Sequence, residues 1–445
     1  MYGKLLFLFI ILVSSGGARA ILPIQHWQTA NGARVYFVEN RDIPMLDLSI
    51  DFAAGSGFDR ADKAGVASMT NRILRLGAEG MNEDEIASKI ADVGARISGR
   101  FDSDRAGLGM RTLSSRAERE QALEVYTRIL HKPLFPQQAF DREKTRLLGA
   151  LKESDIQPGT IAGLTFNRLM YGAHPYGLRS SGDIESVGRI TRDDLTAFYR
   201  RHYVARNAVI AIMGDLSRED ANAIAERVSA GLPQAQGAAD LLPPVEAQQQ
   251  HVTRLIAHHA SQSHILIGTI GIARGDPDYF PLFVGNYVLG GGGFASRIND
   301  EVRQKRGLAY SSGSYFSALA QKGAFLITMQ TRKDQAQEAI DVTMKTLRDF
   351  VANGPTAKEL QDAKTNLVGG FPLRIDNNRK IHEYLAVIGF YKLPLTYLDE
   401  FIGNVERVTL ADIKHAFAAR VDPDKLITVV VGAENAAALE KAAAR

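Results

Sequence analysis

The chain has 445 residues, of which 45% are hydrophobic and 23% are charged, a composition typical of globular proteins with sizeable cores and room for two to four domains. Its net charge of +3 and its lack of a long basic run argue against a nucleic-acid-binding protein. Because the chain has no cysteine, disulfides and thiolate metal sites are excluded and stability must come from packing.

Residues 1–20 have the features of a secretory signal peptide. Lys4 gives a positive start, residues 5–13 form an apolar core too short to span a bilayer, and Ala18-Arg19-Ala20 fits a small-x-small cleavage pattern. An uncleaved N-terminal anchor is the alternative. No later run is apolar enough to cross a membrane, so we expect a protein exported to a bacterial periplasm, without stable membrane insertion.

The first half of the remaining chain alternates strand-like and helix-like segments. The pattern predicts a pair of strands at 34–38 and 46–53 and a helix at about 64–76. A further strand follows near 95–104, and a long amphipathic helix covers 118–130.

The segment 232–250, LPQAQGAADLLPPVEAQQQ, is rich in Pro, Gln and Ala and has no hydrophobic periodicity, so it predicts a linker. After this linker, the order of strands and helices expected in the first half is repeated. A strand is expected at 263–272, a helix at about 279–289, a strand near 309–317 and a long amphipathic helix at 335–351.

The two halves also share an ungapped repeat, since residues 187–214 align with residues 405–432. In each copy a threonine, Thr191 or Thr409, is expected to cap a helix that precedes a β-branched strand ending in glycine. The identical pairs are Val187/Val405, Arg189/Arg407, Thr191/Thr409, Asp194/Asp412 and Gly214/Gly432. We therefore expect an α+β fold with two homologous domains, at 21–231 and 251–445, each a mainly antiparallel sheet packed with helices.

Several motifs resemble those of the pitrilysin family, the M16 zinc peptidases that include insulinase and the mitochondrial processing peptidase. They are HPYG at 174–177, the pattern T-x-x-D-L-x-x-F-Y…Y…G-D at 191–215, and LGGGGFASRINDEVRQKRGLAY at 289–310. The last is the most specific, and together with the repeat the resemblance covers nearly all of the mature chain. It implies that the two domains form a half-clamshell, which closes on a second one around a chamber.

In active members of that family, a helix in the first half carries the inverted zinc motif H-x-x-E-H, whose two His bind zinc and whose Glu acts as general base. The corresponding segment here reads GVASMTNRILRLGAEG. Alignment on Gly65 puts Ser68, Asn71 and Arg72 at the His, Glu and His positions. Ala150 takes the place of the third ligand, a Glu from a later helix. The resemblance therefore implies a degenerate zinc site and no metal in this chain.

The ten histidines do not restore such a site. His258, His259 and His264 could be imagined as a cluster on one strand, but we interpret them as a polar strand edge. Glu153 lies close to Ala150 in sequence and would supply only one carboxylate. No Ser-His-Asp or Cys-His set with a recognisable context replaces the zinc chemistry.

Arg303 and Tyr310 lie on either side of a Gly break in the stretch EVRQKRGLAYSSGSYF. The resemblance implies that they bind the substrate backbone near the scissile bond. Such donors suit a chamber, because peptide carbonyls need partners once water is excluded. The alternative is a solvated Arg303 and a packed Tyr310, and Arg306 is the residue most easily mistaken for Arg303.

The glycines from Gly290 to Gly293 do not form a phosphate-binding loop, because Phe294, Ala295 and Ser296 follow them instead of the required Lys and Ser or Thr. We expect a turn that opens a helix at 296–304. Whether this turn contacts the substrate stays open.

We therefore expect a non-zinc, substrate-binding subunit of a two-chain peptidase that is inactive alone. A homologous partner would supply H-x-x-E-H and the zinc, and this chain would supply Arg303 and Tyr310 for unfolded peptide substrates. Two alternatives stay open: a non-catalytic peptide-binding or scaffold subunit, and a homodimer that traps peptides without cutting them.

Overall fold

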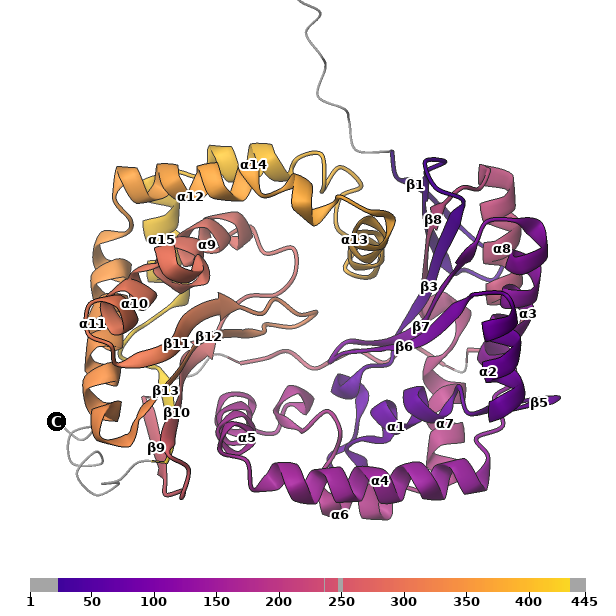
Figure 1. The fold of residues 1–445 in the computed structure, drawn as a ribbon, viewed down its shortest axis with the longest axis horizontal. Helices are drawn as coiled ribbons and strands as arrows, with labels where there is room; N and C mark the ends of the chain where they lie inside the picture. The colour runs from indigo at the N-terminus through magenta and orange to yellow at the C-terminus, as the bar shows by residue number, and fades with distance from the viewer. Residues whose placement is uncertain (1–22, 236, 247–250, 433–445) are drawn as a thin grey trace, which may run out of the picture.

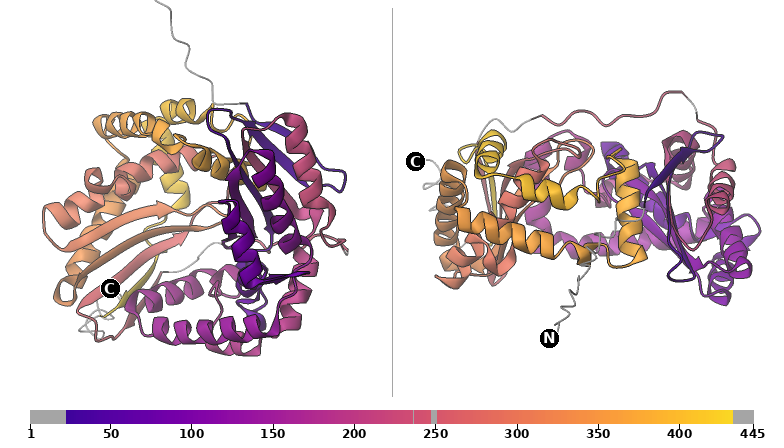
Figure 2. Two further views of the ribbon diagram at one scale, coloured as in Figure 1. Left: turned by 45° about the vertical axis from the view of Figure 1, so that its right-hand side comes forward. Right: turned by 90° about the horizontal axis from the view of Figure 1, so that it is seen from above.

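The computed structural model describes residues 23–235, 237–246 and 251–432. The expected signal peptide at 1–20 lies outside these residues. Two β-sheets, each with its own helices, form the two halves of the molecule (Figure 1). The segment that joins the halves crosses from one to the other, and its described residues, 232–235 and 237–246, form neither helix nor strand (Figure 2).

The N-terminal half is built on a six-stranded sheet with the order β1-β2-β8-β3-β7-β6. Its strands are β1 (Gln25–Gln28), β2 (Arg34–Glu39), β3 (Met45–Ala53), β6 (Arg96–Phe101), β7 (Arg105–Leu113) and β8 (Ala208–Gly214). The short strands β4 (Gly77–Ala78) and β5 (Met81–Asn82) pair separately. The helices are α1 (Val66–Ile73), α2 (Glu83–Asp92), α3 (Arg116–His131), α4 (Gln137–Asp155), α5 (Pro158–Tyr171), α6 (Ile184–Arg189), α7 (Arg192–His202) and α8 (Arg218–Ala230).

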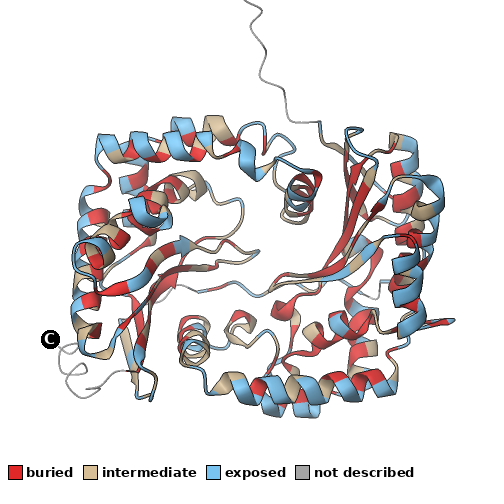
Figure 3. Cartoon of the chain, in the orientation of Figure 1, coloured by how far each residue is buried: buried red, intermediate tan, exposed pale blue. Residues whose placement is uncertain are grey.

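The C-terminal half is built on a five-stranded sheet with the order β11-β12-β10-β13-β9. Its strands are β9 (Val252–Ile256), β10 (Gln262–Ile270), β11 (Ala309–Phe316), β12 (Ala324–Arg332) and β13 (Ile427–Val431). The helices are α9 (Tyr279–Asn286), α10 (Arg297–Asn299), α11 (Ala336–Asn353), α12 (Ala357–Gly369), α13 (Asn378–Phe390), α14 (Phe401–Arg407) and α15 (Leu410–Arg420). Buried residues follow both sheets and the helix faces turned toward them (Figure 3).

Apart from the additional edge strand β1, the two sheets have the same topology, which confirms the expected repeat. Each contains one parallel pair, β2 with β8 and β9 with β13, and its other strands pair antiparallel. Thr191 and Thr409 cap the helices α7 and α15 as expected, each in a capping box with the aspartate three residues later. The α+β fold with two homologous, mainly antiparallel sheets is therefore confirmed.

The expected pairing of the first two long strands is wrong. Strand β8 lies between β2 and β3, parallel to the first and antiparallel to the second. The residues of β8 are all buried, and a central position gives them a partner on both edges. Because β8 is more than 150 residues away in sequence, local pattern cannot show this pairing.

The halves exchange one helix each across their boundary. Helix α5 of the N-terminal half packs on the C-terminal sheet, where Phe166 joins a cluster with Ile427 and Val429 of β13. Helix α13 of the C-terminal half packs on the N-terminal sheet, where Leu385 joins a cluster with Ala211 of β8. Each half thus completes the apolar core of the other.

A buried carboxylate also connects the two halves at this boundary. Asp104, in the turn between β6 and β7, is fully buried. It accepts hydrogen bonds from the hydroxyl of Tyr176 in the HPYG segment, from the hydroxyl of Tyr391 at 2.7 Å and from the backbone N–H of Ala320 at 2.8 Å. Tyr391 and Ala320 belong to the C-terminal half. Burial raises the pKa of Asp104, although the two tyrosine hydrogen bonds act to lower it.

No helix in the described part of the chain is both long and apolar enough to cross a membrane.

Replacing Asp104 with alanine leaves the hydroxyls of Tyr176 and Tyr391 and one backbone N–H without their acceptor. We expect the free energy of unfolding to fall by about 3–5 kcal/mol in urea titrations. Tyr391→Phe removes a single hydrogen bond to the carboxylate and should cost about 1.5–3 kcal/mol. Asp193→Ala, at an exposed aspartate of α7, is the control and should change stability by less than about 0.5 kcal/mol. A fully stable Asp104→Ala protein would contradict the importance of this contact.

His202 makes stability depend on pH. Burial between the rings of Phe58 and Phe198 lowers the pKa of His202 to about 4. The unfolded chain takes up this proton near pH 6.5, so the contribution of neutral His202 is complete above that pH and is lost as the pH falls to about 4. His202→Phe should lose less stability than the native chain between pH 7.5 and pH 4.5, measured by urea unfolding. The same substitution at exposed His251 should leave the pH dependence unchanged.

Candidate functional site

Arg303 and Tyr310 lie side by side at the rim of the C-terminal sheet. Helix α10 runs into a π-helical turn, Asp300–Gln304, which carries Arg303. The chain then reverses at Gly307, whose φ of +64° favours glycine, and enters β11. The Cζ atom of Arg303 lies 5.1 Å from the centroid of the Tyr310 ring, over its face. This contact is a cation–π interaction.

A β-bulge turns Tyr310 outward. In the pairing of β11 with β12, Ala309 faces Thr331 and Ser311 faces Gln330, which leaves Tyr310 without a partner in the ladder. Its side chain is 80% exposed. Bulges of this kind re-aim a side chain and often occur beside functional sites.

Phe294 completes the cluster, and sequence reasoning missed it. The centroid of its ring lies 4.6 Å from the Cζ atom of Arg303, and the residue is 66% exposed. The guanidinium therefore contacts one ring from the glycine segment and one from β11. The available signal was a large apolar residue directly after four glycines. We call Phe294, Arg303 and Tyr310 the aromatic clamp.

The glycine segment has its composition for steric reasons. A Cβ atom on Gly290 would lie 2.3 Å from Oγ of Ser314, so only glycine lets this segment approach β11. Asn286 fixes the same approach by exchanging hydrogen bonds with Ser314. Gly293 has a φ of +60° directly before Phe294. These contacts position Phe294 against Arg303.

The surroundings distinguish Arg303 from Arg306. Arg306 forms an ion pair with Glu301 at 2.5 Å. Within the described ranges, the structure gives no hydrogen bond to the Arg303 guanidinium or to the Tyr310 hydroxyl. The aromatic clamp therefore presents a fixed cation and a hydroxyl, both available as donors to a carbonyl or carboxylate oxygen.

Ser68, Asn71 and Arg72, which the resemblance assigns to the zinc motif, lie on α1, within the helix expected at about 64–76. Asn71 is buried and donates to the backbone oxygen of Gly107 at 2.8 Å and to the Tyr203 hydroxyl at 3.3 Å. Ser68 lies one turn earlier and is half-buried. The Asn71 side chain thus holds the helix against the sheet, and its amide cannot act as a general base.

Arg72 joins α1 to α4 through an ion pair, its Nη1 lying 3.2 Å from the buried carboxylate of Glu143. Arg146 contacts the same carboxylate. Burial acts to raise the pKa of Glu143, but these guanidinium groups outweigh it and lower the pKa. Ala150, further along α4, is exposed. In the described residues no group of three or more His, Asp or Glu side chains is arranged to hold a metal ion.

Two of the histidines singled out in the sequence, His174 and His258, bond backbone atoms. His258 stacks on His259 at 4.3 Å, and its Nε2 atom lies 3.0 Å from the backbone oxygen of Ile156. His174 of the HPYG segment bonds the N–H of Tyr176 and the oxygen of Pro243. These contacts fit the interpretation of both as structural.

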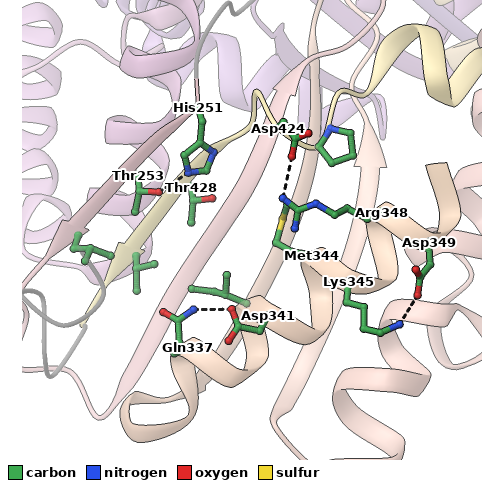
Figure 4. Close-up of a pocket in the computed structure, with 14 residues that line it drawn as sticks. His251, Thr253, Gln337, Asp341, Met344, Lys345, Arg348, Asp349, Asp424 and Thr428 are labelled. Atoms are coloured by element: carbon green, nitrogen blue, oxygen red, sulfur yellow. Dashed lines mark hydrogen bonds and ion pairs between the residues drawn. The ribbon is translucent and has the colours of Figure 1, made fainter. Parts of the chain in front are cut away.

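A groove of about 590 Å³ lies between α11 and the strands β9 and β13 (Figure 4). Leu255, Met344 and Val430 contribute its apolar surface, and an ion pair of 3.0 Å joins Arg348 to Asp424 beside it. In the N-terminal half, α8 packs against the corresponding elements, β2 and α3. We interpret the groove as the counterpart of that helix-covered face, and none of the predicted site residues lines it.

Two family models match adjoining parts of the chain. The one described as "Insulinase (Peptidase family M16)" matches residues 34–178, and the one described as "Peptidase M16 inactive domain" matches residues 189–367. Among named relatives, the "Non-peptidase homolog YmxG" of Helicobacter pylori is 25% identical over 412 residues, which cover 91% of this chain and 93% of that protein.

Solved structures of similar fold extend this result. The peptidase M16 inactive domain from Pseudomonas fluorescens is 38% identical with a TM-score of 0.89, and the match covers 93% of this chain and 98% of that one. The periplasmic protease PqqL from Escherichia coli is 15% identical with a TM-score of 0.77. The match covers 96% of this chain but only 51% of PqqL.

If Ser68, Arg72 and Ala150 occupy former ligand positions, restoring the ligands should restore metal binding. The triple variant Ser68→His, Arg72→His, Ala150→Glu should bind about one zinc ion per chain, measured by metal analysis after dialysis, because zinc needs three protein ligands and a water. The native chain should bind none. The variant with the two histidines alone is the control and should bind zinc more weakly. A folded triple variant without zinc would show that the positions are assigned wrongly.

Proposed function

Since this chain belongs to peptidase family M16, we propose that it is the substrate-binding subunit of a two-chain zinc peptidase. The observation that carries the proposal is the aromatic clamp, which places a half-buried Arg303 beside an exposed Tyr310 while the zinc-motif positions hold Ser68, Asn71 and Arg72. The chain has thus kept the groups that suit substrate binding and lost those that suit metal chemistry.

The clamp fits the binding of an extended peptide. A peptide in a closed chamber exposes carbonyl oxygens that lose their water partners, and an unmet acceptor is costly. The Arg303 guanidinium offers several N–H donors from one plane, and the Tyr310 hydroxyl adds another. Stacking between two rings fixes the guanidinium before the peptide arrives, which reduces the entropy lost on binding.

The partner would be a homologous subunit that carries H-x-x-E-H and a third Glu ligand. Its zinc would supply the activated water, and this chain would hold the peptide in place. The length of PqqL supports such a pairing, because one chain of that protein is about twice as long as the match to this chain. Unfolded peptides are the proposed substrates.

A non-catalytic scaffold or peptide-binding subunit is the second candidate. The name of the Helicobacter pylori relative, a non-peptidase homolog, favours it. The two candidates differ over the aromatic clamp, since a scaffold has no need of a guanidinium that is without a carboxylate partner in the described part of the chain and is held between two exposed rings. The clamp therefore makes the peptidase subunit the preferred function.

Export to a bacterial periplasm is part of the proposal. It is supported by the signal-like sequence of residues 1–20 and by the periplasmic location of PqqL. We also propose domain limits at 21–231 and 251–445, with 232–250 as the linker.

The function is tested by mixing this chain with a homologue that carries the zinc motif, preferably one encoded by the neighbouring gene, and measuring peptide hydrolysis. Neither chain alone should cleave. Arg303→Ala and Tyr310→Phe should each lower kcat of the mixture by about 10²–10³, the effect of removing one donor to the transition state. The zinc content of the mixture should not change.

Arg306→Ala is the matched control, because Arg306 lies three residues from Arg303 but is paired with Glu301. It should leave hydrolysis within about twofold. Full turnover by both clamp variants would disprove the role of the clamp. Cleavage by this chain without a partner would disprove the division of function between two chains.

A further inference from the structure

A second pocket, of about 220 Å³, lies between α13 and the strands β3, β6 and β7. Helix α13 lies on the side of the N-terminal sheet that is turned toward the C-terminal half (Figure 1). Arginines dominate the polar lining, which includes Arg96, Arg100, Arg111 and Arg379. The pocket shares no residue with the aromatic clamp or with α1.

The sheet register explains how these groups come together. Arg96 of β6 lies opposite Arg111 of β7, and Arg111 lies opposite Asp47 of β3. Two residues further along β6, Ser98 lies opposite Gly109. A Cβ atom on Gly109 would lie 3.6 Å from Oγ of Ser98, so the missing side chain leaves space on the sheet between the arginines.

Two of the four guanidinium groups are held by carboxylates. Arg111 makes two hydrogen bonds of 2.7 Å with the buried Asp47. Arg100 contacts Asp51 at 2.9 Å and makes two hydrogen bonds with Glu383 of α13, at 2.8 and 3.0 Å. These pairs fix the wall of the pocket and join the two halves of the molecule.

The other two guanidinium groups, on Arg96 and Arg379, have no carboxylate partner among the residues that the structure describes. Both side chains are exposed at the mouth of the pocket. They come from opposite walls, Arg96 from β6 and Arg379 from the first turn of α13. The pocket therefore carries unbalanced positive charge on two sides of a space large enough for a small anionic group.

We propose that this pocket binds a peptide carboxylate through Arg96 and Arg379, so that the chain prefers peptides with an acidic group. The choice of a peptide as the ligand rests on the proposed function. Guanidinium groups match carboxylates in geometry and form charge-assisted hydrogen bonds with them. The acidic group is either an Asp or Glu side chain or the α-carboxylate at the C-terminus, because both present the same two oxygens.

The test is isothermal titration calorimetry of the purified chain with three decapeptides of otherwise identical sequence. One is neutral and amidated, one is amidated with a central Glu, and one is neutral with a free C-terminal carboxylate. We expect at least one acidic peptide to bind about tenfold more tightly than the neutral one, with an affinity that falls as salt rises. The Glu peptide identifies a side-chain site, and the free-acid peptide identifies a terminal one.

The double variant Arg96→Gln, Arg379→Gln should abolish this preference. Arg254→Gln is the matched control, because Arg254 is an exposed arginine on the edge strand β9 and lies outside the pocket. It should keep the preference. Equal affinity for all three peptides, or an unchanged preference in the double variant, would overturn the proposal. The experiment needs neither partner nor cleavage, so its failure would leave the result of the hydrolysis test standing.

Discussion

The carboxylate of Asp104 is the contact on which the arrangement of the two halves depends. It lies where the β6–β7 turn, the HPYG segment and two segments of the C-terminal half meet, and it accepts hydrogen bonds from each of the last three. A buried charge is stable only when its partners are all in place, so this contact tolerates one relative position of the halves. The exchanged helices α5 and α13 reinforce that position with apolar packing. The clamp on the C-terminal half and the arginine pocket at the boundary between the halves are therefore held in fixed positions.

On helix α1, two of the side chains at the positions compared with the zinc motif have partners of their own. Asn71 is tied to the sheet by two hydrogen bonds, and Arg72 brings a fixed positive charge against the carboxylate of Glu143. At these positions the two helices are therefore joined by an ion pair with a buried carboxylate.

Much of the fold could be predicted because its signals are local. The helix caps at Thr191 and Thr409 and the β-branched strands after them are confirmed, as is the repeat of two similar sheets. The insertion of β8 between β2 and β3 and the exchange of α5 and α13 could not be predicted, because both join segments far apart in sequence. Strand β7 was missed because its two glycines, Gly107 and Gly109, weaken a strand pattern. Arg303 and Tyr310 could be predicted from a sequence motif. The role of Phe294 and the arginine pocket could not, because both depend on contacts between segments of the folded chain.

The aromatic clamp cannot be explained by stability. Phe294 and Tyr310 are 66% and 80% exposed, so their contribution to apolar burial is small, and an exposed cation–π contact adds about 0.5–1 kcal/mol. These side chains are nevertheless held together by a β-bulge, by the positive φ of Gly293 and by the close packing of Gly290 against β11. Features that weaken a sheet edge without strengthening the core are expected where a surface binds something. Because the neighbouring Arg306 is neutralised by Glu301 and Arg303 is not, the positive charge is directed to one point at the rim of the sheet. The arrangement at that point suits a ligand that presents an oxygen atom to the guanidinium.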